Sequence, residues 1–135
     1  MSTPSSKVFV KGATGNGYYT TRNAVLRSHY LEQLLVKAEA EGPSNPSQPT
    51  ELLLPDFPSD ELVRAITHCE REHNVAVRGD PTREQADAKD HELIYGMEHE
   101  GLLRMVGVCH RLGVTSLLNV GATRVAALLL SLIHI

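Results

Sequence analysis

Residues 101–135 read GLLRMVGVCHRLGVTSLLNVGATRVAALLLSLIHI, and this stretch decides the fold. Apolar side chains recur in it at the spacing of one helical face, first up to Gly113 and then again beyond it. Gly113 stands where a left-handed helix cap falls, and Thr115 and Ser116 offer an N-cap for the second run. The pattern therefore predicts two consecutive helices.

The two predicted helices, over residues 102–112 and 115–129, differ in how much of their surface is apolar. The first carries one stripe, formed by Leu102, Met105, Val106, Cys109 and Leu112. The second is apolar on more than one side, through Leu117, Leu118, Val120, Ala122, Val125, Ala126, Leu128, Leu129, Leu130 and Leu132. One of its faces packs on its own domain, and the other requires a partner because small monomers rarely expose a large apolar patch. In the alternative interpretation, this helix is the wrapped centre of a small core.

Composition limits the classes of protein that the chain can represent. Its 135 residues suit one domain that folds without a metal or a disulfide. The formal net charge is −3 and no basic block is present, which argues against a nucleic-acid partner. Cys69 and Cys109 lie within helical apolar patterns, so a reducing intracellular compartment, cytoplasm or nucleus, is expected. No membrane span is expected, because Arg124 and Ser131 interrupt the C-terminal apolar run.

The earlier part of the chain, residues 7–73, is predicted to form a core of sheet and helices. Residues 7–11 and 18–21 are β-rich, and the Asn-Gly pair at 16–17 between them predicts a β-hairpin. The apolar run 51–54 is ended by a proline and is typical of a third, buried strand.

Two further helices are expected in this core. Residues 23–41 are helical in pattern, with Ser28 capping a second segment whose buried stripe is Tyr30, Leu31, Leu34 and Leu35. Another helix begins after Pro58 with Ser59 as its cap. Its buried stripe is Leu62, Val63, Ile66 and Cys69.

The remaining segments predict loops and a platform. Residues 42–49 hold helix breakers and small polar side chains, and residues 74–90 are polar with few apolar anchors, so both are expected to be loops. Residues 91–130 then supply the platform helices. The acidic residues Glu61, Glu70, Glu72, Glu98 and Glu100 are expected on solvated helix faces. The whole chain is predicted to be a single α+β domain.

Several short stretches resemble one family. LPDF at residues 54–57 is similar to that family's Leu-Pro-Asn-Val, and THC at 67–69 falls where its helix ends in Trp-Cys. DHEL at 90–93 resembles Asp-Gln-Glu-Phe, and LGVTSLLNV at 112–120 parallels Leu-Asp-Ile-Lys-Gly-Leu-Leu-Asp-Val. In this order the stretches resemble the Skp and elongin C proteins, small relatives of the BTB/POZ domain.

This resemblance implies a fold and a role. The fold is BTB/POZ-like: a small three-stranded sheet packed with helices, followed by two C-terminal platform helices. The role is that of an adaptor, which joins an F-box-like helical segment of a substrate receptor to a cullin ubiquitin ligase. The residues implied for the F-box-like contact are Val114, Leu117, Leu118, Val125, Leu128 and Leu129.

The chain departs from the family at two places. His110 and Arg111 stand at the cullin-facing position, where the family has asparagine and an aromatic residue. Losing an aromatic anchor at an interface centre weakens binding, because such anchors are typical hot spots. The family also continues with two more helices, so the resemblance implies that the chain after about Leu129 is either incomplete or carries residues that are not native. These departures favour an alternative function, a structural subunit of a large cytoskeletal or organellar assembly without a cullin.

Catalytic, cofactor and metal chemistry are not expected. The loop KGATGNG at 11–17 resembles the start of nucleotide-dependent reductases, but the following residues favour a strand over the helix that holds a pyrophosphate. His68, Cys69, His73, Cys109 and His110 are metal-ligand types, although neighbouring helical residues project about 100° apart and do not converge. No nucleophile motif is visible. The chain is therefore interpreted as a non-enzymatic protein.

Overall fold

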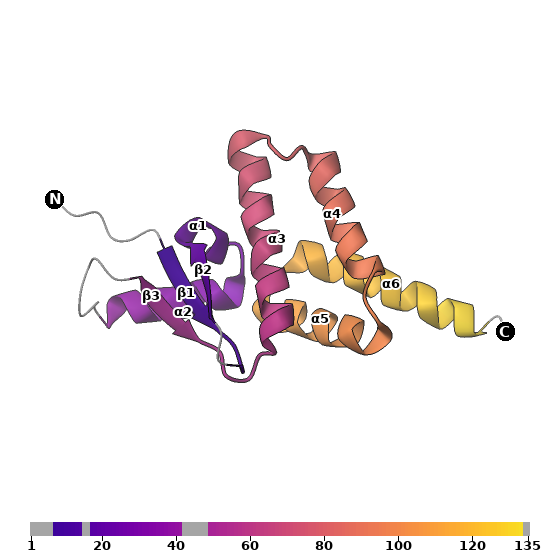
Figure 1. The fold of residues 1–135 in the computed structure, drawn as a ribbon, viewed down its shortest axis with the longest axis horizontal. Coiled ribbons are helices and arrows are strands. Elements are labelled where there is room, and N and C mark those ends of the chain that lie inside the picture. The colour runs from indigo at the N-terminus through magenta and orange to yellow at the C-terminus, as the bar shows by residue number, and fades with distance from the viewer. Residues whose placement is uncertain (1–6, 15–16, 42–48, 134–135) are drawn as a thin grey trace.

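The computed structural model describes residues 7–14, 17–41 and 49–133, and Figure 1 shows their arrangement. The chain is an α+β protein, as predicted, with one three-stranded sheet and six helices in this described part. Strand β1 (Lys7–Lys11) lies between β2 (Gly17–Thr21) and β3 (Thr50–Leu53). It pairs antiparallel with β2, with Val8 opposite Thr20, and parallel with β3, with Val8 opposite Thr50. The three predicted strands are confirmed, while the turn at 15–16 and most of the loop predicted at 42–49 lie outside the described residues.

Helices α1 (Arg22–Val25) and α2 (His29–Ala40) form the crossover that a parallel β1–β3 pair requires. Ser28 caps α2 as predicted, since its Oγ accepts a hydrogen bond from Leu31 N at 3.2 Å. The same hydroxyl donates to Leu112 O at 2.6 Å, which ties α2 to the end of a distant helix. Leu31 is fully buried, but Tyr30, which is predicted beside it, is exposed, with its ring centroid 5.7 Å from that of Phe57.

Helix α3 (Ser59–Arg78) stands in the middle of the molecule, with the sheet, α1 and α2 on one side and the remaining helices on the other (Figure 1). Its buried stripe contains the predicted Leu62, Ile66 and Cys69. The predicted cap is wrong: Pro58 occupies the N-cap position. Ser59 instead accepts a hydrogen bond from Thr14 N at 3.0 Å, and so fixes the loop after β1.

The polar loop predicted at residues 74–90 is wrong. Helix α3 continues to Arg78 and ends at Gly79, which has a positive φ of 65°. Helix α4 (Arg83–Tyr95) then begins with a capping box, in which the side chains of Thr82 and Gln85 satisfy each other's backbone N–H groups. The apolar pattern does not reveal this helix, because good helix formers and ion pairs, rather than an apolar stripe, stabilise it.

The two platform helices are confirmed as α5 (His99–Leu112) and α6 (Thr115–Ile133). Gly113 ends α5 with a φ of 74°, in the left-handed conformation that was predicted. Thr115 and Ser116 are already helical, so their predicted capping role is wrong. Leu118 N donates the first hydrogen bond of α6 to Val114 O, which puts Val114 at the cap.

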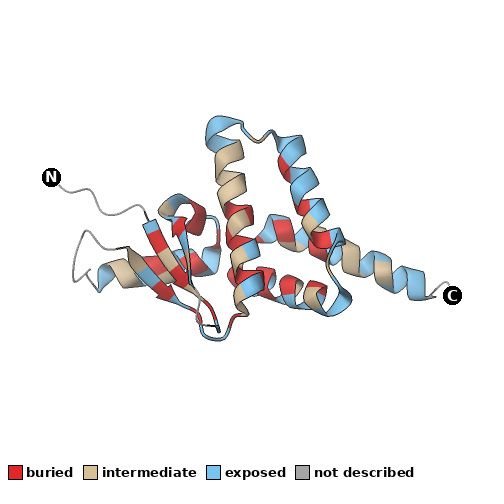
Figure 2. Cartoon of the chain, viewed as in Figure 1, coloured by how far each residue is buried: buried red, intermediate tan, exposed pale blue. Residues whose placement is uncertain are grey.

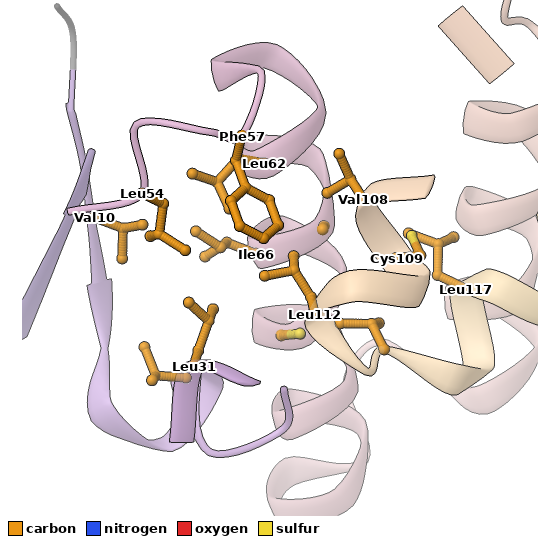
Figure 3. Close-up of a cluster of buried hydrophobic side chains, with 14 of the residues drawn as sticks. Val10, Leu31, Leu54, Phe57, Leu62, Ile66, Val108, Cys109, Leu112 and Leu117 are labelled. Atoms are coloured by element: carbon orange, nitrogen blue, oxygen red, sulfur yellow. The ribbon is translucent and has the colours of Figure 1, made fainter. Parts of the chain in front are cut away.

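The hydrophobic core lies on both sides of α3 (Figures 2 and 3). Val10 from the sheet and Leu31 from α2 point toward Ile66 of α3, and Leu112 of α5 closes the same cluster. Each fully buried aliphatic side chain contributes about 1.5–3 kcal/mol to stability before the entropic cost of ordering it. This core holds α5 and the start of α6 in place.

Candidate functional site

The second half of α6 carries three exposed leucines within four residues. Figure 2 shows that this half carries no buried residue and extends beyond α4 and α5. We call four of its exposed apolar residues, Ala126, Leu129, Leu130 and Leu132, the distal face of α6. The three leucines are 55%, 56% and 65% exposed. Leucines this exposed on one short stretch form the kind of patch that marks an interaction site.

The first half of α6 packs against α4 and α5, whereas the second half has no buried residue. Gly121 is buried because α5 approaches closely: a Cβ there would lie 2.8 Å from Val106 Cγ2. One turn later the Arg124 guanidinium lies 4.6 Å from the ring centroid of Tyr95, the last residue of α4. Beyond this point α6 leaves the neighbouring helices (Figure 1).

The six predicted contact residues divide into three groups. Val114 and Leu117 are 3% and 0% exposed, so in this structure they are buried and present no surface to a partner. They pack in the core because the start of α6 rests against α5. Leu118, Val125 and Leu128 are half-buried against that core, and only Leu129 is exposed. Sequence periodicity could not separate these groups, since it shows which residues are apolar but not where the neighbouring helices end.

Helix α6 also meets the minimum length and apolar content for crossing a membrane, over Thr115–Leu132, contrary to the prediction that no segment does. Only 11% of this window is buried. The window qualifies although it contains Arg124, because one charged residue does not lower its mean hydropathy enough. One such helix is weak evidence for a membrane span, because some core helices of soluble proteins pass the same test.

The cullin-facing position predicted at His110 and Arg111 lies in the last turn of α5, and both residues are exposed. Arg111 is used within its own domain. Its guanidinium carbon lies 3.9 Å from the ring centroid of Phe57, and its Nη1 donates a hydrogen bond to Asp56 O at 3.1 Å. The arginine thereby covers a ring that is buried beneath it.

A second candidate site is polar and joins three helices. His68 of α3, which is 1% exposed, lies between Asp90 of α4 and Ser116 of α6. Its Nδ1 is 2.8 Å from Asp90 Oδ1, and its Nε2 is 2.7 Å from Ser116 Oγ. We call these three residues the His68 cluster. Asp90 and Ser116 are 22 and 48 residues from His68 along the chain, so only the packing of the helices brings the three residues together.

Ion pairs surround the His68 cluster. Arg71 Nη1 donates to Asp90 Oδ1 at 2.8 Å, and Glu72 Oε1 lies 3.7 Å from His68 Nε2. Both terminal nitrogens of Arg83 reach the Glu72 carboxylate. These hydrogen bonds lower the pKa of Glu72 and raise that of Arg83. Each carboxylate beside the histidine is therefore neutralised by an arginine.

Metal binding was not expected, yet His68, Glu72 and Asp90 place one possible ligand atom each within 4.8 Å of one another. The two arginines already supply the positive charge that a cation would bring, so the donor set does not favour a metal. Of the ligand types noted in the sequence, only His68 belongs to this group. Burial raises the pKa of Cys69 and of Cys109 to about 12, which keeps both thiols neutral and poor ligands.

A cavity of about 520 Å³ opens beside the His68 cluster. The start of α6 lines it with Val114, Thr115 and Ser116, and α3 lines it with His68 and Glu72 among others. The α1 region closes the remaining side. Ser116 is exposed, so its hydroxyl meets both the cavity and the buried imidazole.

One feature of the sequence indicates this second site, namely the position of His68. His68 is placed among the apolar residues of α3, one residue from Cys69 and two from Ile66, and a histidine at such a position needs a buried polar partner. Three acidic residues expected on solvated faces are likewise engaged. Glu61 bonds to Arg104, Glu72 to Arg83, and Glu70 accepts hydrogen bonds from two residues of β2.

The loop that resembles a reductase motif does not continue as a dinucleotide site requires. Strand β2 follows it along the chain, in the place where a dinucleotide site has the helix that receives the pyrophosphate. Comparisons with protein-family models and with curated proteins find no match for this chain.

Proposed function

We propose that this protein is an adaptor with a BTB/POZ-like fold, similar to Skp and elongin C, that binds an F-box-like helical segment of another protein on the distal face of α6. The exposure of Leu129, Leu130 and Leu132 on a helix that extends beyond its own domain carries the proposal. The order of elements supports it: a hairpin, a helix pair, a third strand parallel to the first, and helices that end in a platform.

The chemistry of the distal face suits a helical partner. Leu129 and Leu132 are three residues apart on a helix, so their side chains form one ridge, and Ala126 leaves room one turn earlier. An amphipathic helix packs leucines of its own beside such a ridge, and a few central anchors then supply most of the affinity.

The test is direct binding of a fluorescently labelled F-box domain, measured by anisotropy with the intact chain. Replacing Leu129 and Leu132 together by serine is expected to weaken binding at least about tenfold, since each lost leucine anchor costs about 1 kcal/mol or more. Leu118 and Leu128 are unsuitable for this purpose because both pack against the core.

The matched control is Leu103→Ser. Leu103 is 61% exposed on α5, so this variant removes an equally exposed leucine outside the distal face. It is expected to bind like the unchanged chain, and circular dichroism should show all variants folded. Equal binding by the double variant, or no binding by the unchanged chain, contradicts the proposal.

A second function, a structural subunit that uses the same fold without a cullin, is favoured by Arg111. This residue stands where the resemblance places an aromatic cullin anchor, and it is packed on Phe57 instead. Purification with associated proteins separates the two functions: cullin among them supports the ligase adaptor, whereas cytoskeletal or organellar proteins without cullin support the structural subunit.

A further inference from the structure

The His68 cluster contains the elements of a nucleophilic site at the wall of a cavity. We propose that Ser116 is the nucleophile of a second, catalytic site, with His68 as its general base and Asp90 as the residue that positions the imidazole, and that this site cleaves small acyl esters. The site does not involve the distal face of α6. It therefore stands or falls independently of the adaptor function, and it revises the expectation of a non-enzymatic chain.

The hydrogen bonds define the role of each group. The Asp90 carboxylate accepts only, so the Nδ1 that lies 2.8 Å from it carries the proton. In the neutral ring, Nε2 is then the acceptor, and Ser116 donates its hydroxyl proton to it across 2.7 Å. Both distances lie within the range that proton transfer between a nucleophile and its base requires.

A nucleophilic site needs a buried base and an accessible nucleophile, and the His68 cluster has both. His68 is excluded from water, which strengthens its hydrogen bonds, while Ser116 remains exposed to the cavity. The cavity of about 520 Å³ is in the range that accommodates small molecules, and Leu26 and Val114 give it apolar wall. A short acyl chain fits this combination of size and lining.

The start of α6 provides hydrogen-bond donors for an oxyanion. Ser116 is the second residue of the helix, and the first helical hydrogen bond is donated by Leu118. The N–H groups of Ser116 and Leu117 therefore precede the hydrogen-bonded turns and are directed toward the N-terminal end. Together with the positive end of the helix dipole, such donors stabilise negative charge that develops beside the serine.

The reaction balances with water as the only co-substrate. Ser116 Oγ attacks the carbonyl carbon of the ester while its proton passes to His68 Nε2, and the carbonyl oxygen takes the electron pair of the C=O π bond. The electron pair returns, the bond to the alcohol oxygen breaks, and that oxygen receives the proton from His68. Water then attacks the acyl-serine by the same route, which releases the carboxylic acid and restores the serine.

The charged neighbours are compatible with this cycle. Glu72 Oε1, 3.7 Å from Nε2, stabilises the imidazolium that forms when Ser116 gives up its proton. Arg71 keeps the Asp90 carboxylate in place through its hydrogen bond to Oδ1.

The test uses a fluorophosphonate, which reacts with activated serines by forming an O–P bond and releasing fluoride. Incubation of the intact chain at neutral pH, followed by mass spectrometry of its peptides, is expected to place the adduct on Ser116. Ser116→Ala should abolish labelling and the hydrolysis of p-nitrophenyl acetate above background. Ser131→Ala, an exposed serine on the same helix, should leave both unchanged.

The positioning role of Asp90 is tested with Asp90→Asn, which is expected to slow labelling at least about tenfold and to change its pH profile, because the amide favours the wrong imidazole tautomer. A purely structural cluster would change thermal stability without any adduct. Absence of an adduct on Ser116 of the unchanged, folded chain overturns the proposal, and this measurement requires no variant. Hydrolysis by Ser116→Ala at the rate of the unchanged chain also overturns it.

Discussion

At the scale of single residues, the two cysteines show how burial controls reactivity. Cys69 and Cys109 are buried on neighbouring helices, and the loss of solvation raises the pKa of each thiol to about 12. Thiolate, the reactive form, is therefore scarce at pH 8. We predict that a maleimide modifies neither cysteine of the native chain within minutes and both in concentrated urea, as measured by intact mass. Rapid modification under native conditions would show that α3 and α5 separate.

The ion pair between Glu72 and Arg83 makes stability depend on pH. Hydrogen bonds from Arg83 lower the pKa of Glu72 in the folded state below its unfolded value. A depressed carboxyl pKa stabilises the fold above the unfolded pKa, and this contribution is lost as the pH falls through the folded pKa. Glu72→Gln is expected to lower the free energy of unfolding by about 1 kcal/mol at pH 7, a modest value because Arg83 is half exposed.

Urea denaturation across pH tests this dependence. The difference between Glu72→Gln and the unchanged chain should disappear in acid, once Glu72 is protonated in the folded state. Glu92→Gln serves as the control, because Glu92 is an exposed carboxyl on the helix that also carries Arg83. A difference for Glu72→Gln that persists at acid pH would mean that the glutamate acts by packing rather than by charge.

At the scale of elements, the α5–α6 connection depends on a single glycine. Gly113 has a φ of 74°, and a Cβ there would lie 3.0 Å from His29 Cβ. We predict that Gly113→Ala lowers the free energy of unfolding by about 1–2 kcal/mol, since both the backbone conformation and the contact become unfavourable. Gly107→Ala should instead stabilise α5 by up to about 1 kcal/mol, because Gly107 lies inside the helix with open space around it. Thermal melts of the two variants compare the effects, and equal shifts would contradict this assignment.

Elements with a strong apolar period were predictable from the sequence, and elements held by polar contacts were not. The periodicity of residues 102–112 located α5, and the apolar run before Pro55 located β3. Helix α4 was missed because a capping box at Thr82 and its ion pairs stabilise it, and neither contributes to an apolar period. The N-cap of α3 differs from the prediction for a similar reason. The sequence shows that Ser59 can accept a hydrogen bond, but packing decides which N–H group donates it.

Of the two candidate sites, the apolar helix was predictable from the sequence and the polar cluster was not. The apolar character of α6 was visible in the sequence, and Leu129 is exposed as the distal face requires. Which leucines are covered depends on where α4 and α5 end, a matter of tertiary packing. The His68 cluster could not be predicted, because Asp90 and Ser116 meet the histidine only after three helices have assembled.

At the scale of the whole molecule, α3 has apolar contacts on both sides and buried hydrogen bonds to the helices on one of them. On the side of the sheet and α2 it packs through aliphatic side chains (Figure 3). On the other side its hydrogen bonds to α4 and α6 run through the His68 cluster. The start of α6 is therefore fixed by both direct hydrogen bonding and core packing, while the second half of the helix has no buried residue among those described.

This presentation leads to a prediction about the free protein. No described residue covers the leucines of the distal face, so their apolar surface is exposed to water. Contact with another apolar surface removes this surface from water and lowers the free energy. We predict that the isolated chain self-associates as its concentration rises, measured by sedimentation velocity. The double change of Leu129 and Leu132 to serine should shift it to monomer, while Leu103→Ser should not. An F-box domain that binds the same face should also dissociate these assemblies, because both compete for one surface. If the double variant still self-associates, the surface that mediates self-association lies elsewhere, and the reason for regarding α6 as the docking helix is removed.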